Sequence, residues 1–547
     1  MMKRWIFRLI TMTVLVLGLS ISASAATTTE DGFVLEQDSY YGLTVTGYVG
    51  PGGYISVPEG VKRIDSSAFS DNRTIQSVTL PEGVTYIGND AFSGCSSMQT
   101  INIPSKVTTI GPSAFSDCSA LISIEIPDGV AEISVSTFMN CSSLVSVNIP
   151  EGVTIINNHA FSGCSSLQSV DIPSSVKSIG SSAFSGCSKL ASISMSDNIT
   201  SIGSSAFSDC TSLFDVDFSA NVTNLTNSLF SGCTQLTSLD FIPDTIYSIG
   251  DETFAETGLE SVTLPATVTS LGDRAFSGCE NLTSFTVPED MTLYYCGNSI
   301  LTNCTSLTNV NIPTEYATIW DYNFSGCSSL EKIVVPDGVT ELSPGSFANC
   351  TSLKTVSLPN GITSFPDPDR YFNGAGLFEN CTALEAITLP ETVETIGENA
   401  FFGCTALTNV RLPDGVVSIG AYAFDGCDNL KSIYIPASVT TFGSDVFDWR
   451  SSVVILGISG SAAEEYAEEY GLTFHDTTAS EMTFRFRKGE TVRLTAAPDP
   501  GYHFVRWESN TAGVEFSDPN SATTTFVMPA SEVSITAIFE ADDPVET

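Results

Sequence analysis

The amino-acid sequence predicts a solenoid, a fold in which short coils of similar sequence stack on one another. The first observation is a block of 23 residues that recurs along most of the chain, as in PSSVKSIGSSAFSGCSKLASISM from Pro173 and PETVETIGENAFFGCTALTNVRL from Pro390. The second is a constant aromatic position, which can be followed through 17 copies of the block. A period of this length is typical of solenoids, because each coil buries its apolar face only against its neighbours.

The aromatic position sets the register of the repeat. It is occupied by Phe69, Phe92, Phe115, Phe138, Phe161, Phe184, Phe207, Phe230, Phe254, Phe276, Leu301, Phe324, Phe347, Phe378, Phe401, Phe424 and Phe447. Two intervals exceed 24 residues, since Phe276 and Leu301 are 25 apart and Phe347 and Phe378 are 31 apart. Extra residues in a solenoid form loops on one face, so we expect a loop in each of these coils.

Each coil is expected to contain two short extended segments and one tight turn. Residues 167–172 alternate apolar and polar side chains, which is typical of a short strand with one face inward. Pro173 ends this strand, because proline lacks the N–H that a ladder needs. Val176 and Ile179 indicate a second extended segment on the opposite wall, and residues 182–184 a single helical or 3-10 turn. Stacking then produces parallel ladders of strands.

The repeat frame P-x-x-V-x-x-I-G-x-x-A-F-S-x-C-x-x-L-x-x-I-x-I resembles the BspA-type leucine-rich repeat over residues 33–476. The resemblance implies a right-handed leucine-rich repeat solenoid with short parallel β-strands and single helical or 3-10 turns, in about 17 coils of 23 residues. It also implies export, display on a bacterial or protozoan surface, and adhesion to host proteins or other cells. No catalytic residue of the family can be transferred to this chain.

The first 25 residues are expected to be a signal peptide. They combine a positively charged start, a short apolar core and the small-residue cleavage site Ala23-Ser24-Ala25. The apolar run is too short to span a membrane comfortably. No second hydrophobic span follows, and the chain ends in ADDPVET with neither an apolar tail nor a wall-sorting motif. We therefore expect a secreted or cell-surface protein whose mature chain does not insert into a membrane.

Both ends of a solenoid need a cap, because an end coil otherwise exposes its core. Residues 26–57 are expected to form the N-terminal cap, residues 58–452 the solenoid, and residues 453–476 a C-terminal cap of strand, helix and strand. Ser461 is suited to start the helix, with Glu464 completing a capping box. A helix is expected from Ala462 to Tyr470, and Gly471 should end it.

A different kind of sequence follows the cap. Residues 480–541 lack the Phe and Cys period, and their alternating apolar residues and turns predict a small all-β module. The elements G-Y-x-F-x-x-W and T-F-x-M-P resemble the divergent internalin-type B-repeat. The resemblance implies a spacer or a minor binding domain.

The charge of the chain restricts the class of partner. Lys and Arg total 21 and Asp and Glu total 62, giving a net charge of -41. This acidity argues against nucleic acid and anionic lipid as partners. Apolar residues make up 42% of the chain, which is ample for a continuous core.

The cysteines follow the repeat. Fourteen of the 15 occupy one column, three residues after the aromatic position: Cys95, Cys118, Cys141, Cys164, Cys187, Cys210, Cys233, Cys279, Cys304, Cys327, Cys350, Cys381, Cys404 and Cys427. The same position holds Asn72, Thr257 and Arg450 in other copies. A position that accepts Cys, Asn and Thr indicates a small group that satisfies buried backbone, so we expect buried thiols. Disulfides or a metal site are the less favoured alternatives.

No constellation for catalysis or for a cofactor is recognisable. The three histidines, His159, His475 and His503, lie in different parts of the chain, and the repeat frame supplies no nucleophile and acid to accompany them. Column cysteines lack the C-x-x-C spacing of zinc sites. We therefore expect no enzyme activity, no cofactor and no metal.

Two surfaces are candidates for ligand contact. The outward strand face is small and polar, and it is acidic at Asp171, Asp215, Asp217 and Asp240. The alternative is a solvated ladder of Ser and Thr selected for tight stacking. The 31-residue interval inserts a loop at 366–376 whose Asp369, Arg370, Tyr371 and Phe372 have the composition of a contact loop, although a tolerated insertion is the alternative.

These observations favour an exported, non-enzymatic binding protein. The expected activity is adhesion to, or recognition of, a protein or glycan ligand on a host or microbial surface through the solenoid. The alternative is a structural or carbohydrate-associated component of the cell envelope.

Overall fold

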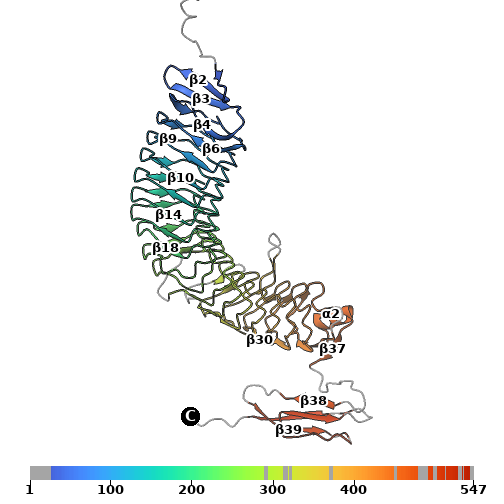
Figure 1. Ribbon diagram of the computed structural model, residues 1–547. Coiled ribbons are helices and arrows are strands. Elements are labelled where there is room, and N and C mark those ends of the chain that lie inside the picture. The colour runs from blue at the N-terminus through green and yellow to red at the C-terminus, as the bar shows by residue number, and fades with distance from the viewer. Residues whose placement is uncertain are drawn as a thin grey trace, which may run out of the picture. The chain divides into compact units, whose positions relative to one another are not determined.

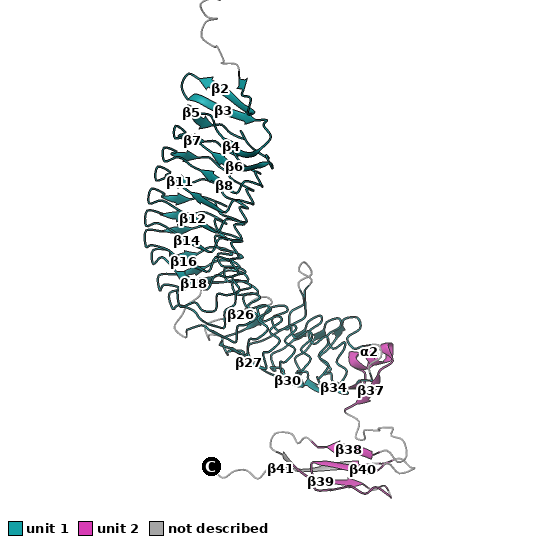
Figure 2. Ribbon diagram, viewed as in Figure 1, with its two compact units in different colours: residues 1–453 teal, residues 454–547 magenta. Residues whose placement is uncertain are grey.

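A computed structural model describes residues 26–288, 294–311, 318–319, 323–368, 374–448, 452–477, 491–496, 502–509, 511, 513–527, 533 and 535–541. The chain divides into two compact units, Met1–Val453 and Val454–Thr547 (Figure 2). The predicted signal peptide, residues 1–25, lies outside the described residues.

The first unit begins with an antiparallel sheet that closes the end of the stack. Strands β1 (Thr27–Thr28), β2 (Phe33–Asp38) and β3 (Gly42–Tyr48) pair antiparallel, and β3 then pairs parallel with β5 (Val61–Ile64). The buried ring of Phe33 lies 6.3 Å from Phe69, the first ring of the repeat. The hairpin therefore covers the apolar interior that the first coil would otherwise expose.

Two walls of short parallel strands run along the stacked coils (Figure 1). The first wall contains β4 (Gly53–Ser56), β6 (Ile75–Thr79), β8 (Thr100–Asn102), β10 (Ser123–Glu125), β12 (Ser146–Asn148), β14 (Ser169–Asp171), β16 (Ser192–Ser194), β18 (Asp215–Asp217), β21 (Ser261–Thr263), β23 (Ser284–Thr286), β25 (Asn309–Val310), β27 (Lys332–Val334), β29 (Thr355–Ser357), β30 (Ala386–Thr388), β32 (Asn409–Arg411) and β34 (Ser432–Tyr434). Runs of two or more neighbouring strands pair in register, as Ser146 does with Ser169.

The second wall lies on the other side of the core. It contains β5, β7 (Tyr86–Ile87), β9 (Thr109–Ile110), β11 (Glu132–Ile133), β13 (Ile155–Ile156), β15 (Ser178–Ile179), β17 (Ser201–Ile202), β19 (Asn224–Leu225), β20 (Ser248–Ile249), β22 (Ser270–Leu271), β24 (Tyr295–Cys296), β26 (Thr318–Ile319), β28 (Glu341–Leu342), β31 (Thr395–Ile396), β33 (Ser418–Ile419) and β35 (Thr441–Phe442). Its strands also pair in parallel, as Ser178 does with Ser201. The predicted leucine-rich repeat solenoid is thus confirmed.

A ladder of phenylalanine rings fills the third side of the core. Consecutive rings stack almost parallel, with centroids 5.3 Å apart and 10° between the planes of Phe161 and Phe184. Tight turns place these rings, since the N–H of Ala183 bonds to Gly180 O and that of Ser185 to Ser182 O. The turns do not extend into a helix, because Ser182 has the left-handed φ of 53°.

The cysteine column ties each coil to the one before it. All 14 column cysteines are buried free thiols, and each donates its S–H to a carbonyl oxygen, as Cys164 Sγ does to Phe138 O at 3.1 Å. Thr257 differs, because its hydroxyl donates to Phe254 O of its own coil at 2.8 Å, the same carbonyl that accepts the S–H of Cys279 from the next coil. Asn72 differs, because its Oδ1 accepts backbone N–H groups instead. Arg450 lies outside the described residues.

The second unit begins with β36 (Val454–Gly457), α2 (Ala462–Tyr470) and β37 (Thr473–Asp476), in which β36 and β37 pair in parallel. Gly471, with φ 69°, ends the helix. The expected capping box does not form: the Ser461 hydroxyl is buried without a partner and makes no cap hydrogen bond. The Glu464 carboxylate instead accepts the N–H of Gly460 at 2.6 Å, one residue before the N-cap.

The rest of the second unit is a small antiparallel module, as predicted. Strand β38 (Thr491–Thr495) pairs with β40 (Thr523–Val527), and β39 (Tyr502–Ser509) pairs with β41 (Ile535–Ala541). Val492 and Phe526 form its buried core. The indole N–H of Trp507 donates to Ser521 O at 3.0 Å.

Candidate functional site

The candidate site is the outward side of β10, β12, β14, β16 and β18, which we call the outer face. The central residue of each strand points into the core and is buried: Ile124, Val147, Val170, Ile193 and Val216. The flanking residues therefore point outward, because side chains alternate along a strand. Parallel pairing within β10, β12 and β14 and within β16 and β18 fixes these outward side chains at the coil spacing of about 4.8 Å, and the N–H of Ala191 bonds to Gln168 O between the two groups.

Three of the four predicted acidic residues lie on the outer face. Asp171 ends β14 and Asp217 ends β18, two coils further along the same column. Asp217 accepts a hydrogen bond from Ser194 Oγ at 2.8 Å. Asp215 begins β18 and pairs with Ser192 of the preceding coil. We call Glu125, Asp171 and Asp217, which alternate with Asn148 and Ser194 in one column, the acidic row.

The fourth residue, Asp240, was wrongly expected on the strand face. It lies in a turn, where its carboxylate accepts from Ser238 Oγ at 3.1 Å and the N–H of Ile242 bonds to Leu239 O. The interval from Phe230 to Phe254 has one residue more than the standard block. The turn takes up this residue, so Asp240 does not extend the ladder of the outer face.

The structure does not bring the predicted loop residues to this face. Asp369, Arg370, Tyr371 and Phe372 lie outside the described residues. Before them, Asp367 Oδ1 accepts the N–H of Glu398 at 2.8 Å, which ties the start of the insertion to the next coil.

An apolar row beside the acidic residues was not predicted. One residue directly precedes each of the five strands of the outer face, and four of these five residues are apolar. We call the four apolar residues the apolar row: Ile122, Val145, Ala191 and Phe214, with Gln168 at the same position in the middle coil. Their backbones form a continuous ladder, in which the N–H of Val145 bonds to Ile122 O and that of Phe214 to Ala191 O. Phe214 is 65% exposed and Ile122 48% exposed.

The sequence did contain a signal for the apolar row. Each member follows the buried leucine position of its coil, as Phe214 follows Leu213 and Ile122 follows Leu121. Alternation along a strand predicts that the two residues beside the central residue point outward, but it makes no prediction for the residue before the strand. Only the two flanking positions were therefore expected on the outer face. An aromatic residue at a position held elsewhere by Gln, Thr or Glu was the available clue.

The outer face carries acidic side chains that have no ion-pair partner among the described residues. Asp171, Asp215 and Asp217 form no ion pair with any cation in the described part of the chain. Lys189 is exposed in the segment before β16 and is the nearest cation in sequence to these strands. A group of exposed carboxylates attracts a cationic partner over a distance that depends on the ionic strength.

A second exposed cluster lies at the N-terminal cap. Tyr40 is 86% exposed and packs edge-on against Tyr41, whose ring lies 4.3 Å from the Arg63 guanidinium. The ring of Tyr86 lies 3.7 Å from the same guanidinium. The N–H groups of Tyr41 and Tyr40 lower the pKa of Asp38 by bonding to its carboxylate. This cluster presents planar groups to solvent beside one positive charge.

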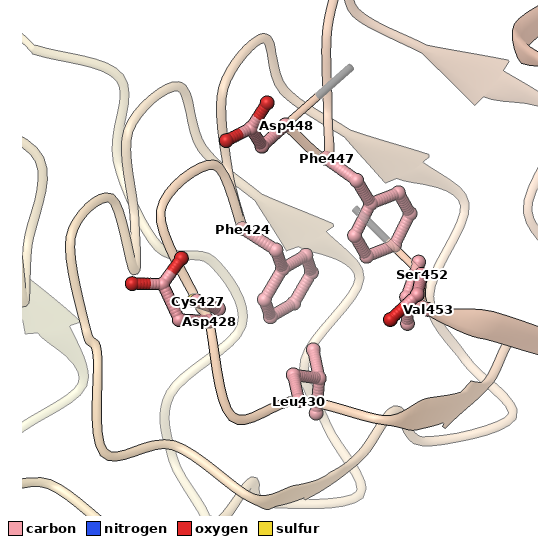
Figure 3. A pocket seen from close by; sticks show the side chains of 8 residues that line it. All are labelled: Phe424, Cys427, Asp428, Leu430, Phe447, Asp448, Ser452 and Val453. Atoms are coloured by element: carbon pink, nitrogen blue, oxygen red, sulfur yellow. The ribbon is translucent and has the colours of Figure 1, made fainter. Parts of the chain in front are cut away.

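A cavity of 270 Å³ lies where the phenylalanine ladder ends in the first unit. It is lined by Phe424, Cys427, Asp428, Leu430, Phe447, Asp448, Ser452 and Val453. Figure 3 shows the rings of Phe424 and Phe447 facing the cavity, with the Asp428 and Asp448 carboxylates directed away from them. The Cys427 thiol in this lining donates its S–H to Phe401 O, and burial raises its pKa to about 12, so the thiol is not activated as a nucleophile.

In the part of the chain that the structure describes, no group of three or more His, Cys, Asp or Glu side chains could hold a metal ion. Among the helices of that part of the chain, none has both the length and the apolar composition for crossing a membrane.

Comparison with known proteins identifies both parts of the chain. A family model described as BspA type leucine rich repeat region matches residues 53–168, 131–257, 247–374 and 372–464. A model of the divergent InlB B-repeat domain matches residues 470–543. No curated protein matches the chain.

Several solved structures are similar to this chain. A leucine rich cell surface protein from Faecalibacterium prausnitzii is 28% identical, with 67% of this chain and 95% of that one covered and a TM-score of 0.47. A leucine-rich repeat protein from Bacteroides ovatus is 26% identical, with 76% and 99% covered and a TM-score of 0.45.

Proposed function

The chain belongs to the BspA-type leucine-rich repeat family, and from this membership we propose that it is an exported adhesion or recognition protein. It binds a protein or glycan of a host or microbial surface through its solenoid. Leucine-rich repeat proteins are typically non-enzymatic scaffolds that bind proteins, and BspA-type members are typically found at the cell surface.

The observation that carries the proposal is the outer face. Five consecutive coils hold its side chains in register, and a backbone ladder fixes their spacing. A preformed surface binds with little loss of conformational entropy, since the backbone is already ordered before contact. Exposed apolar and acidic side chains on such a surface favour a macromolecular partner over a small molecule.

The second candidate is a structural or carbohydrate-associated role in the cell envelope, which the N-terminal cluster favours. Tyr40, Tyr41 and Tyr86 expose planar aromatic groups beside Arg63. Rings of this kind combine an apolar face with a polar group, which suits contact with a sugar ring. Retention of the protein by purified cell wall in the absence of any host ligand would favour this role.

The experiment that tests the proposal is a pull-down with the full mature chain from mucus, extracellular-matrix and cell-wall fractions. We expect capture of a macromolecule that Asp215→Asn with Asp217→Asn weakens at low salt, because exposed charges are screened at high salt. Tyr371→Ala with Phe372→Ala tests the loop candidate, which should depend less on salt. If only removal of residues 480–547 abolishes capture, binding belongs to the terminal module and the proposal fails.

A further inference from the structure

We propose that the outer face binds a cationic amphipathic helix of a partner protein. Such a helix carries lysine or arginine along one side and apolar residues along the adjacent side. The inference rests on the proposed function, because it names the class of partner that this face would recognise. It is carried by the apolar row and the acidic row, which run in parallel over the same five coils.

The apolar row is the first step of the argument. Phe214 at 65%, Ile122 at 48% and Val145 at 37% are unusually exposed for large apolar side chains. They lie in one backbone ladder rather than scattered, because each coil bonds to the next at this position. A row of apolar side chains held in water is typical of a surface that a partner covers.

The acidic row determines the charge of that partner. Asp171 and Asp217 lie two coils apart, and Glu125 lies two coils before Asp171. Two coils correspond to about 9.6 Å at the strand spacing. The same face of an α-helix returns every seven residues, which is about 10.5 Å. A helix lying along the stack can therefore place a cation opposite each carboxylate in turn.

The space between the two rows fits the width of a helix. Ile122 and Glu125 are three residues apart in one coil, which limits the distance between the two rows to about 10 Å. Between the rows lie the small side chains of Ser123, Ser146, Ser169 and Ser192 and, in the fifth coil, the carboxylate of Asp215. Because an α-helix with its side chains is about 10 Å wide, it can lie over these serines and contact both rows.

Other occupants fit this face less well. A second copy of the chain is disfavoured, because each copy has a net charge of -41 and the acidic rows would repel. A nucleic acid is disfavoured for the same reason. A neutral glycan would contact the apolar row but would leave the carboxylates without a partner. Binding of a neutral polysaccharide that depends on Phe214 and not on Asp171 would contradict the inference.

The test uses the full mature chain and two synthetic helical peptides of equal length and charge. Both have lysines at seven-residue spacing; one has leucines on the adjacent side, and the other has glutamines there. We expect the leucine peptide to bind roughly tenfold more tightly, because its apolar side covers the apolar row. Equal affinity for the two peptides would overturn the inference, since it would indicate charge attraction alone.

Three double variants assign the binding to the face. Ile122→Ser with Phe214→Ser should remove the preference for the leucine peptide, and Asp171→Asn with Asp217→Asn should weaken both peptides about fivefold at low salt. The matched control is Val417→Ser with Glu394→Gln, an exposed valine and a carboxylate on neighbouring coils of the second wall, which should change neither. If the control has the same effect as the face variants, the site is not the outer face.

The two hypotheses can fail separately. If pull-downs capture a surface macromolecule but the face variants bind it normally, the helix inference is wrong and the proposed adhesion stands. If nothing is captured from any fraction and the leucine peptide still binds at the outer face, the adhesion proposal is wrong and the inference stands.

Discussion

Cys164 shows how a single residue links two coils. Its thiol donates to Phe138 O in the previous coil, and burial raises its pKa to about 12. Thr257 occupies the same position and also donates to a phenylalanine carbonyl, although that carbonyl, Phe254 O, belongs to its own coil. The side chain is therefore selected for its small size and its donor, and its redox chemistry is not used in the fold.

The chemical state of the thiols gives the first prediction. Mature protein unfolded with an alkylating reagent and no reductant should show most of its 15 cysteines modified. In the folded state few should react, because burial keeps the column thiols protonated and inaccessible. Mass spectrometry counts the modified residues. A spectrum with seven disulfides would refute the account of this column.

The raised thiol pKa values also predict loss of stability in alkali. The unfolded thiol has the ordinary pKa of 9.0, whereas burial raises the pKa of Cys164 in the fold to about 12. Between these values the folded state binds more protons, so the free energy of unfolding falls as pH rises, by about 1.4 kcal/mol per pH unit for one such thiol. Denaturant titration from pH 8 to pH 11 measures the slope. Cys164→Ser should reduce it, and an unchanged slope in the variant would contradict the argument.

Core and surface residues of one coil should differ sharply in their effect on stability. Phe184 is fully buried between two stacked rings, so Phe184→Ala should cost about 3–5 kcal/mol. Asp171 is exposed on the outer face, and Asp171→Ala should change the free energy of unfolding by at most about 0.5 kcal/mol. Denaturant midpoints of the two variants check this. Similar losses would mean that the inward and outward assignments are wrong.

At the scale of elements, the coil is the unit that the sequence predicted well. Period, strand positions and the buried column follow from side-chain alternation and from the repeated Phe and Cys. The backbone conformation of the turn was not predicted from the sequence. Asn140, before Cys141, has φ 59°, and Gly163, before Cys164, has φ 74°, so this position is left-handed. Glycine and asparagine there were the signal, because both tolerate that conformation.

Local irregularities explain the errors at this scale. A periodic pattern cannot say where an extra residue is accommodated, so Asp240 was assigned to a strand although a turn at Leu239 and Ile242 displaces it. The cap helix began as its composition indicated, but Glu464 bonds to Gly460 and not to the expected position. Such choices depend on competing hydrogen bonds whose energies are similar.

Deleting coils tests whether they are equivalent units. Removal of residues 173–195, one complete block, should leave a folded and shorter solenoid, because stability is roughly a sum over neighbouring coils. Removal of half a block should disrupt it, since inward and outward positions would no longer align between coils. Circular dichroism and thermal melting compare the two deletions. Equal behaviour of both would refute the repeat architecture.

At the scale of the whole molecule, the family and the fold follow from the sequence, whereas the contact surface follows only in part. The net charge of -41 restricts the partner class, and the repeat predicts a long binding surface. The acidic residues of the outer face could be predicted because they occupy the same strand positions in successive copies of the repeat. The apolar row was missed, because only the two positions beside the central strand residue were expected to point outward, although Phe214 stands at a position held by polar residues in other coils.

The most direct measurement of the central claim is carboxylate labelling of the mature chain with and without a captured macromolecule. A carbodiimide label read by mass spectrometry reports the solvent accessibility of each carboxylate. The account predicts protection of Asp171, Asp215 and Asp217 on the outer face, and unchanged labelling of Glu394 on the second wall. Protection confined to residues 480–547, with the three aspartates labelled as in the free protein, would contradict the claim that the solenoid binds.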